Sequence, residues 1–329
     1  MLNGLYVMDL ARFPDIYGED ERAAIEQQLR IVAPPLAPAE LTADLLADVD
    51  VLVTAWGGPQ LTAELLESAP RIGLVLYGAG SVRSVVTPES WARGVRVTTA
   101  NSVIAESVAE FTLAQVLYAL KHGWRYVLGS RERAEALPRA NNEPGAAGSV
   151  VGLMSLGATG QATARLLGRH ELDLQAYDPY VDPATAASLG VRLVSLEELF
   201  ATSDVVSLHA PVLDATRKVV STELLSSMKH DATLINTARG ALIDEDALVT
   251  VLRERTDLFA VLDVTDPEPA LPGSPLFSAT NIVVTPHLAG TLNTERRRQG
   301  QLMAAELKRY VAGEPLEHEI FESGQARSA

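Results

Sequence analysis

The sequence of 329 residues contains no cysteine, so it can form neither a disulfide nor a thiolate metal site and offers no cysteine nucleophile. Cationic residues are also few: 27 Lys and Arg stand against 42 Asp and Glu, which gives a net charge of -15. Because nucleic acids and anionic membranes attract clustered Lys and Arg, this balance argues against both as partners. A small anionic ligand would therefore need a local positive site.

Apolar runs of the roughly 18 residues needed to cross a membrane are missing. The first residues, MLNGLYVMDLARFP, lack the basic start and apolar core of a signal peptide. We therefore expect the protein to remain where it is synthesised, in the cytoplasm. The hydrophobic content of 47% is sufficient for one or two sizeable cores, and the chain length favours two domains.

The first 99 residues alternate apolar strand candidates with helix candidates, which predicts an α/β unit with a parallel sheet. We expect residues 1–99 to form a substrate domain that is completed by residues 288–329, in which 293–312 is an amphipathic helix. The strand candidates are LYVMDL from Leu5, 50–54, RIGLVLYGAG and VRVTTA, and the helix candidates are ERAAIEQQLRIV, LTAELLESA and PESWARG.

A second alternating series predicts a doubly wound domain over residues 100–287, with an active-site cleft between the two domains. Within it, the stretch 106–128 has apolar residues at helical spacing on more than one face. We expect a single connecting helix there that supports a homodimer. The bridge RANNEPGAAG is polar and glycine-rich, and we expect the tail FESGQARSA to be disordered. The strand candidates are VVGLM, LDLQAYD, SDVVSLHA, DATLIN, DLFAVLDV and NIVVTP.

The segment SLGATG, residues 155–160, has the outline of a dinucleotide-binding turn, but serine stands where the first glycine belongs. VVGLM supplies the strand before it and QATARLLGR the helix after it, whose positive end would face a pyrophosphate. Gly157 permits close approach of the backbone and Gly160 close packing of helix and strand, whereas Ser155 is restricted in φ. The competing interpretation is a cofactor-free helix start that is merely small and loose.

The next strand candidate ends in Asp178, about 20 residues after the turn, where a carboxylate would accept hydrogen bonds from the ribose hydroxyls of NAD. No Arg or Lys follows in Pro179 and Tyr180 to neutralise a 2′-phosphate, so the sequence predicts NAD rather than NADP. Strand, turn, helix and acid together favour a cofactor site over the loose helix start.

Three more segments follow strand candidates of the second domain: NTARG at 236–240, LDVTDPEP at 262–269 and TPHLAG at 285–290. Ligands bind at such carboxyl ends of parallel strands. With these segments in this order, the chain resembles the D-isomer-specific 2-hydroxyacid dehydrogenase family over nearly its whole length. The resemblance implies two Rossmann-like or flavodoxin-like domains and NAD-dependent hydride transfer between a 2-oxo acid and a D-2-hydroxy acid.

The resemblance also implies roles for individual residues. Arg239 would clamp the substrate carboxylate and polarise the C2 oxygen, His287 would be the acid/base, and Glu268 would pair with that histidine. The backbone N–H groups of the turn Tyr77, Gly78, Ala79 and Gly80 would hold the substrate carboxylate. The implied cofactor contacts are Gly157, Ala158, Thr159, Gly160, Asp178, Ala210, Pro211, Thr216, Thr237, Ala238, Arg239, Asp263, His287 and Gly290.

Some alternatives stay open in the sequence. Taken singly, Arg239 could be a surface ion pair, Glu268 a turn residue and His287 a strand-end cap, but their joint order favours catalysis. Trp56 could be an apolar wall for a substrate larger or more apolar than glycolate, or a core or subunit-interface residue. We read His209 as structural or as part of the cofactor wall, expect a solvated face at 296–298, and expect no metal site because the other histidines lack ligand spacing.

A second hypothesis is a binding protein that uses NAD occupancy as a switch, as corepressor relatives of this family do. The complete set of Arg239, Glu268 and His287 favours the enzyme. Formate dehydrogenases share the fold but carry an amide in place of the histidine's acid partner, so Glu268 argues against that chemistry. A cluster of Lys or Arg that would bind a substrate phosphate is missing from the first-domain loops, which disfavours phosphoglycerate. We expect hinges near residues 99–105 and 285–292.

Overall fold

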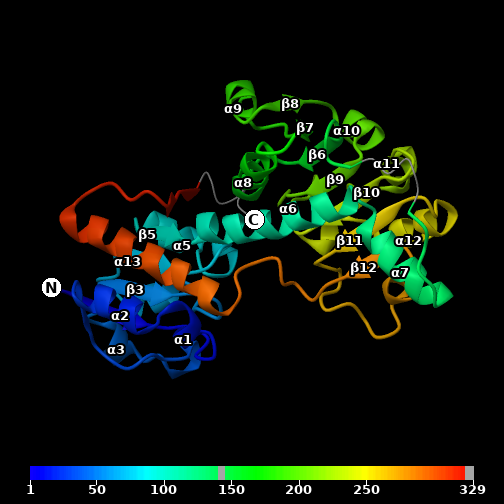
Figure 1. Ribbon diagram of the computed structural model, residues 1–329. Helices are drawn as coiled ribbons and strands as arrows, with labels where there is room; N and C mark the ends of the chain where they lie inside the picture. The colour runs from blue at the N-terminus through cyan, green and yellow to red at the C-terminus, as the bar shows by residue number, and fades with distance from the viewer. Residues whose placement is uncertain (140–144, 323–329) are drawn as a thin grey trace. The chain divides into compact units, whose positions relative to one another are not determined.

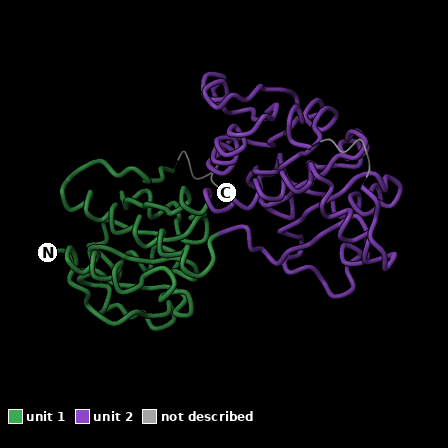
Figure 2. Tube along the Cα trace, in the orientation of Figure 1, with its two compact units in different colours: residues 1–104, 291–329 green, residues 105–290 purple. Residues whose placement is uncertain are grey.

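The computed structural model describes residues 1–139 and 145–322, and the chain forms two compact units (Figure 2). Unit 1 contains residues 1–104 and the segment from Thr291 onward, and unit 2 contains residues 105–290. The chain therefore changes unit a few residues after each boundary expected from the sequence. The central part of the bridge, 140–144, and the tail from 323 onward lie outside the described residues, so the expectations for them stay predictions.

Unit 1 is built on a six-stranded sheet in which every neighbouring pair is parallel except the last strand, which is antiparallel to its neighbour. The central strands are buried along their whole length, as expected for a sheet covered on both faces. In spatial order the strands are β13 (Glu319–Ile320), β5 (Arg96–Thr99), β4 (Leu74–Tyr77), β3 (Val51–Thr54), β1 (Leu2–Tyr6) and β2 (Leu29–Ile31).

Short helices connect these strands, and the long C-terminal helix of the chain packs onto the same core through Met303 and Leu307 (Figure 1). The expected amphipathic helix over 293–312 is present as a 3-10 turn, Asn293–Arg296, followed by α13 (Arg297–Ala312). The other helices of unit 1 are α1 (Phe13–Ile16), α2 (Glu19–Glu26), α3 (Ala43–Leu46), α4 (Ala63–Ser68) and α5 (Pro88–Ala92).

The first strand and helix differ from their predicted limits. The predicted strand from Leu5 is β1 over Leu2–Tyr6, and the predicted helix ERAAIEQQLRIV ends at Glu26, after which Leu29–Ile31 forms β2. β2 pairs with β1, and a Cβ atom at Gly4 would lie 2.6 Å from Leu29 Cδ1, so the glycine makes room for this strand. Pairing with a distant strand thus overrides the local helical pattern.

Unit 2 is a doubly wound parallel sheet, as the sequence predicts, but it has seven strands: Val191–Leu193 is not among the six strand candidates. The first strand of this sheet along the chain is β6. The chain then runs outward to β8 and returns to the other side of β6 at β9, so the strand order reverses between β6 and β9. In spatial order the strands are β12 (Ile282–Val284), β11 (Phe259–Leu262), β10 (Thr233–Asn236), β9 (Val205–Leu208), β6 (Val150–Met154), β7 (Asp173–Tyr177) and β8 (Val191–Leu193). The connecting helices are α8 (Ala158–Leu167), α9 (Pro183–Ser188), α10 (Leu196–Thr202), α11 (Thr222–Ser227) and α12 (Glu245–Glu254).

The single helix expected over 106–128 is wrong: the structure has two helices, α6 (Asn101–Ala119) and α7 (Gly123–Arg133), bent by 62°. His122 adopts the left-handed conformation, with φ 51°, which ends the first helix. A Cβ atom at Gly123 would lie 2.3 Å from the Tyr118 ring, so this glycine lets the ring pack over the break. In the described residues no single helix has the length and hydropathy of a membrane span, and only α6 and α7 taken together across the bend meet that test.

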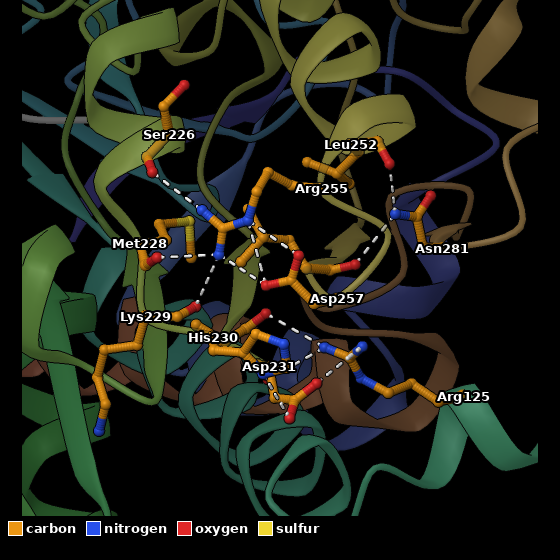
Figure 3. A network of polar contacts seen from close by, with 12 residues as sticks. Arg125, Ser226, Met228, Lys229, His230, Asp231, Leu252, Arg255, Asp257 and Asn281 are labelled. Atoms are coloured by element: carbon orange, nitrogen blue, oxygen red, sulfur yellow. Dashed lines mark hydrogen bonds and ion pairs between the residues drawn. The ribbon is translucent and has the colours of Figure 1, made fainter.

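The amino ends of the unit 2 strands are fixed by two arginines (Figure 3). Arg255 donates to Asp257 Oδ2 at 2.6 Å and to the carbonyls of Ser226 and Met228, while Arg125 of α7 donates to the carbonyl of Asp231 at 3.0 Å. The hydrogen bond from Arg255 lowers the pKa of the Asp257 carboxyl to about 2. The segments that lead into β10 and β11 are therefore fixed by structural contacts.

Candidate functional site

The glycine turn follows β6 and leads directly into α8, whose N-cap is Gly157 with φ -65° and ψ -169°. A Cβ atom at Gly160 would lie 2.1 Å from the carbonyl oxygen of Ser155, so a larger residue would push the helix away from the strand. At Gly157 a Cβ atom would meet only Ser155 Oγ, at 3.8 Å, so the backbone there faces open space. The turn thus has the close packing and the exposed backbone that a pyrophosphate requires.

Asp178 comes directly after β7, and its carboxylate lies beside the turn. Its Oδ2 accepts from the backbone N–H of Leu156 at 2.8 Å and from the hydroxyl of Ser155 at 3.2 Å. Its Oδ1 accepts from the backbone N–H groups of Tyr180 at 2.8 Å and Val181 at 3.1 Å. Turn and acid therefore form one hydrogen-bonded group at the start of α8, where the sequence predicts the adenosine ribose and pyrophosphate of NAD.

The loop after β9 closes on itself. The hydroxyl of Thr216 donates to the carbonyl of Pro211 at 2.6 Å and accepts from the N–H of Leu213 at 2.8 Å. Ala210 is buried, and the preceding His209 is tied to β6 by its backbone N–H, which donates to Met154 O at 2.9 Å. Thr216 thus fixes the loop with its hydroxyl. The cofactor contacts expected of Ala210, Pro211 and Thr216 stay predictions.

The imidazole of His209 is buried beside Ser207, whose Oγ lies 3.0 Å from His209 Nε2. Burial lowers the pKa of this imidazole from 6.5 to about 4. Between these two pH values the unfolded chain binds a proton that the folded chain does not, so the free energy of unfolding falls as the pH decreases from 6.5 toward 4. Above pH 6.5 the imidazole is neutral in the folded and the unfolded chain, so this loss of stability is absent.

We expect lowering the pH from 6.5 to 5 to reduce the free energy of unfolding through this one group by about 2 kcal/mol, from roughly 1.4 kcal/mol per pH unit. His209→Gln keeps a polar group next to Ser207 but does not titrate, so its stability should fall less over the same range. Urea unfolding of both proteins at the two pH values measures the difference. Equal pH dependence of the two proteins would contradict this assignment.

The loop after β10 is ordered by Asn236, a fully buried residue at the end of that strand. Its Oδ1 accepts from the N–H of Ala238 at 3.0 Å, and its Nδ2 donates to the carbonyl of Arg239 at 2.9 Å. Thr237 lies 3.1 Å, Oγ1 to Oγ1, from Thr112 of α6. Asn236 is a positioning residue that the predicted site omits; its signal is an Asn at a strand end, which closes such turns through its side chain.

The next residue, Gly240, brings the loops after β10 and β11 into direct backbone contact. A Cβ atom at this position would lie 2.0 Å from the carbonyl carbon and 2.3 Å from the carbonyl oxygen of Thr265, and 2.5 Å from the nitrogen of Asp266. Arg239 and the loop that carries Glu268 are therefore held against each other by a glycine.

The loops after β11 and β12 are joined by the buried carboxylate of Asp263. It accepts from the hydroxyl of Thr285 at 2.6 Å, from the N–H of Leu288 at 2.9 Å and from the N–H of Ala289 at 2.8 Å. The carbonyl of Asp263 accepts from the N–H of His287 at 2.9 Å. In the structure the Asp263 carboxylate organises the histidine loop. Its expected contact to the cofactor stays a prediction.

The imidazole of His287 is hydrogen-bonded through Nδ1 to Oε1 of Glu268. The backbone of His287 has φ 53°, a left-handed conformation that is uncommon outside glycine and that turns this side chain out of the strand direction. The side chains are 48% and 39% exposed, respectively, so the pair is reachable from solvent. With Nδ1 engaged by the carboxylate, Nε2 is the nitrogen that can exchange a proton with a ligand.

The turn Tyr77 to Gly80 in unit 1 corrects one expectation. The N–H of Gly78 donates to the carbonyl of Thr54 at 2.8 Å, and the N–H of Ala79 donates to the carbonyl of Tyr77 at 2.7 Å. The first bond continues the pairing of β3 and β4 and the second closes a local turn, so both donors are engaged within the unit. The Gly80 N–H is the donor of this turn that stays in our proposal.

Gln299 of α13 fixes the same turn from the other side. Its Nε2 donates to the carbonyl of Gly78 at 2.7 Å, and its Oε1 accepts from the hydroxyl of Thr291 at 2.9 Å. Gln299 is fully buried. The sequence gives no signal for this role, because the two segments are far apart along the chain.

The expectation of a solvated face at 296–298 is wrong for Arg296, which is 9% exposed. Its Nη1 lies 2.5 Å from Asp15 Oδ2, its Nε donates to the carbonyl of Thr291 at 3.2 Å, and its Cζ lies 5.8 Å from the ring centroid of Trp56. A paired carboxylate and an aromatic face compensate for the burial of the guanidinium. Trp56 is half-buried against the unit 1 core, and its role as an apolar wall for a substrate stays a prediction.

In the described part of the chain no group of three or more His, Asp or Glu side chains is placed to hold a metal ion. The features found in unit 2 are those of a nicotinamide-dependent oxidoreductase: a tight glycine turn, an acid at the end of the next strand, and a histidine paired with a carboxylate. Comparison with known proteins gives the family.

The model of the NAD-binding domain of D-isomer specific 2-hydroxyacid dehydrogenases matches residues 113–289, and the chain belongs to this family. It is 31% identical over 285 residues to a glyoxylate reductase of Korarchaeum cryptofilum, with 86% of this chain and 85% of that protein covered. It is 30% identical over 290 residues to a D-3-phosphoglycerate dehydrogenase of Methanocaldococcus jannaschii, with 88% of this chain but only 55% of that protein covered.

Among solved structures, the TT0316 protein from Thermus thermophilus has a TM-score of 0.74 at 28% identity, with 96% of this chain and 99% of that chain covered. The predicted fold class, family, enzyme class and NAD cofactor are therefore confirmed. The chain spans about half the length of the phosphoglycerate dehydrogenases it matches and most of the length of the glyoxylate reductase.

Proposed function

We propose that this protein interconverts a 2-oxo acid and a D-2-hydroxy acid, with His287 and Glu268 as the acid/base pair and Arg239 as the carboxylate anchor. The observation that carries the proposal is the hydrogen bond between His287 Nδ1 and Glu268 Oε1. This bond is supported by the backbone and carboxylate contacts that Asp263 makes to the histidine loop.

When bound, NAD supplies the hydride acceptor or donor. In the reductive direction His287 donates the proton from Nε2 to the C2 oxygen, and Glu268 stabilises the imidazolium form through Nδ1. Arg239 binds the substrate carboxylate with its planar guanidinium and polarises the C2 oxygen. The residues proposed to hold the cofactor are Gly157, Ala158, Thr159, Gly160, Asp178, Ala210, Pro211, Thr216, Thr237, Ala238, Arg239, Asp263, His287 and Gly290.

For the substrate we propose an acid with an apolar side chain larger than that of glycolate. The support is Trp56, which is half-buried and whose ring lies under Arg296, so that one apolar surface and one cation lie together in unit 1. Tyr77 and Gly80 remain part of the proposed substrate site, whereas the N–H groups of Gly78 and Ala79 are engaged elsewhere. The name of the glyoxylate reductase relative makes glyoxylate the small reference substrate.

The test is the oxidation of NADH, followed by its absorbance, against a panel of 2-oxo acids graded by side-chain size and charge. NADPH runs in parallel. We expect turnover with NADH on the larger apolar acids and slower turnover on glyoxylate. Two variants distinguish a role of the Trp56 ring in substrate binding from a role in folding. Trp56→Phe keeps an aromatic surface and Trp56→Ala removes it, and the substrate KM and the stability of both are measured. No turnover across the panel, with NADH still bound, would favour the alternative of an NAD-sensing binding protein.

We also propose a cytoplasmic homodimer formed through α6 and α7. In support, Tyr118 on α6 is 39% exposed, and α7 has no buried residue although it is 11 residues long. Light scattering should give about twice the chain mass of 35.2 kDa. A mass equal to that of one chain at micromolar concentration would reject the dimer.

A further inference from the structure

Every acceptor position of the Asp178 carboxylate is taken by a donor of this chain. A carboxylate offers about four lone-pair positions on its two oxygens. In the structure they receive the hydroxyl of Ser155 and the N–H groups of Leu156, Tyr180 and Val181. The ribose of a bound NAD needs such positions for its hydroxyls, so one of these four donors has to leave.

The Ser155 hydroxyl is the donor that can leave. Its bond to Oδ2 is the longest of the four at 3.2 Å, whereas the three backbone donors lie at 2.8 to 3.1 Å and are fixed by their turns. A hydroxyl needs only a rotation about χ1 to release its acceptor, whereas a backbone N–H needs a change of the chain path.

The same hydroxyl also occupies the second cofactor contact of the turn. Ser155 Oγ accepts from the N–H of Gly157 at 3.4 Å, and Gly157 is the residue whose backbone faces open space at the start of α8. One side chain thus satisfies both the acid and the N–H that the ribose and the pyrophosphate would otherwise contact. In addition, Ser155 has φ 84°, a left-handed conformation that a glycine adopts without strain and a serine does not.

We propose that Ser155 lowers the affinity of the protein for NAD, because its hydroxyl competes with the cofactor for Asp178 and for the N–H of Gly157. This inference rests on the proposed cofactor site. Serine in place of the first glycine of the turn thus sets a weaker, faster-exchanging cofactor site without removing the acid that selects NAD over NADP.

The experiment compares the Kd of NADH, measured by fluorescence titration without substrate, in the wild type, Ser155→Ala and Ser155→Gly. Ser155→Ala removes only the hydroxyl and should lower the Kd by roughly three- to tenfold, the effect of one competing hydrogen bond. Ser155→Gly removes the hydroxyl and the strained Cβ and should lower it at least as much. The decrease in Kd should be smaller with NADPH, which has a phosphate in place of the 2′-hydroxyl of the adenosine ribose. Ser188→Ala, an exposed serine of α9 in the same unit, is the matched control and should leave the Kd unchanged.

An unchanged or higher Kd in Ser155→Ala would overturn the proposal, since the hydroxyl would then be neutral or a contact to the cofactor. Asp178→Asn separates this failure from a failure of the cofactor site itself. If the site is correct, Asp178→Asn raises the Kd of NADH whatever the serine does. If the site is wrong, neither Asp178→Asn nor the Ser155 variants change it.

Discussion

His287→Gln should lower kcat for the reduction of a 2-oxo acid by about 10²- to 10⁴-fold, the range typical of a positioned general acid. Glutamine keeps a polar side chain of similar length but cannot donate and accept a proton in turn. The Kd of NADH should change much less than kcat, because His287 is only one of the proposed cofactor contacts and the turn and Asp178 lie at other strand ends. Steady-state kinetics and a binding titration measure the two quantities.

Glu268→Gln is the companion variant for the same pair. It keeps an atom that can bond His287 Nδ1 but removes the charge, so the fall in kcat should be smaller than in His287→Gln and should depend on pH. Turnover of His287→Gln equal to wild type would reject the assignment of the acid/base. A large rise in the Kd of NADH in His287→Gln would instead indicate a structural role of the histidine loop.

Gly240→Ala should destabilise the protein by about 3 kcal/mol or more and should also reduce kcat by on the order of 10²-fold. The added Cβ atom would overlap the backbone of Thr265 and Asp266 at 2.0 to 2.5 Å, and backbone atoms cannot move aside as a side chain can. The two loops that separate to relieve the overlap carry Arg239 and Glu268, so stability and catalysis should fall together. Urea unfolding and steady-state kinetics test the two effects.

Gly129→Ala in α7 is the matched control. There the added Cβ atom would meet only the end of the flexible Leu137 side chain, at 2.7 Å to Cδ1, and alanine favours the helix. This variant should unfold at the same or a slightly higher urea concentration than the wild type and should keep its activity. A Gly240→Ala protein that is as stable and active as Gly129→Ala would show that the loop contact is not needed.

The sequence carries most of the information for unit 2. Most of its strands are predominantly apolar, and the residues at or directly after their last positions, such as Asp178, Asn236 and Asp263, lie at strand ends as expected. The strands could be predicted because a strand buried on both faces has a local composition that differs from its surroundings. Positions at strand ends follow from the strands alone and need no knowledge of long-range contacts.

The features that could not be predicted depend on partners far away in the chain. The apolar periodicity runs on through the break at His122, and nothing local shows that Gly123 accommodates the Tyr118 ring. The burial of Arg296 depends on Asp15 and Trp56, and the engagement of the Gly78 N–H depends on Thr54. Each is decided by tertiary packing, which a pattern of neighbouring residues does not contain.

The return of the chain to unit 1 after residue 290 has a consequence for biosynthesis. Unit 2 is one continuous segment, 105–290, whereas unit 1 needs α13 for its core and β13 for the edge of its sheet. During translation, residues 1–104 therefore cannot complete their core until the segment from Thr291 onward has left the ribosome, while the NAD-binding unit between them has all its strands earlier. Until Gln299 is in place, the turn at Gly78 lacks one of its hydrogen-bond partners, so the nascent chain can complete the NAD-binding unit before this turn of unit 1.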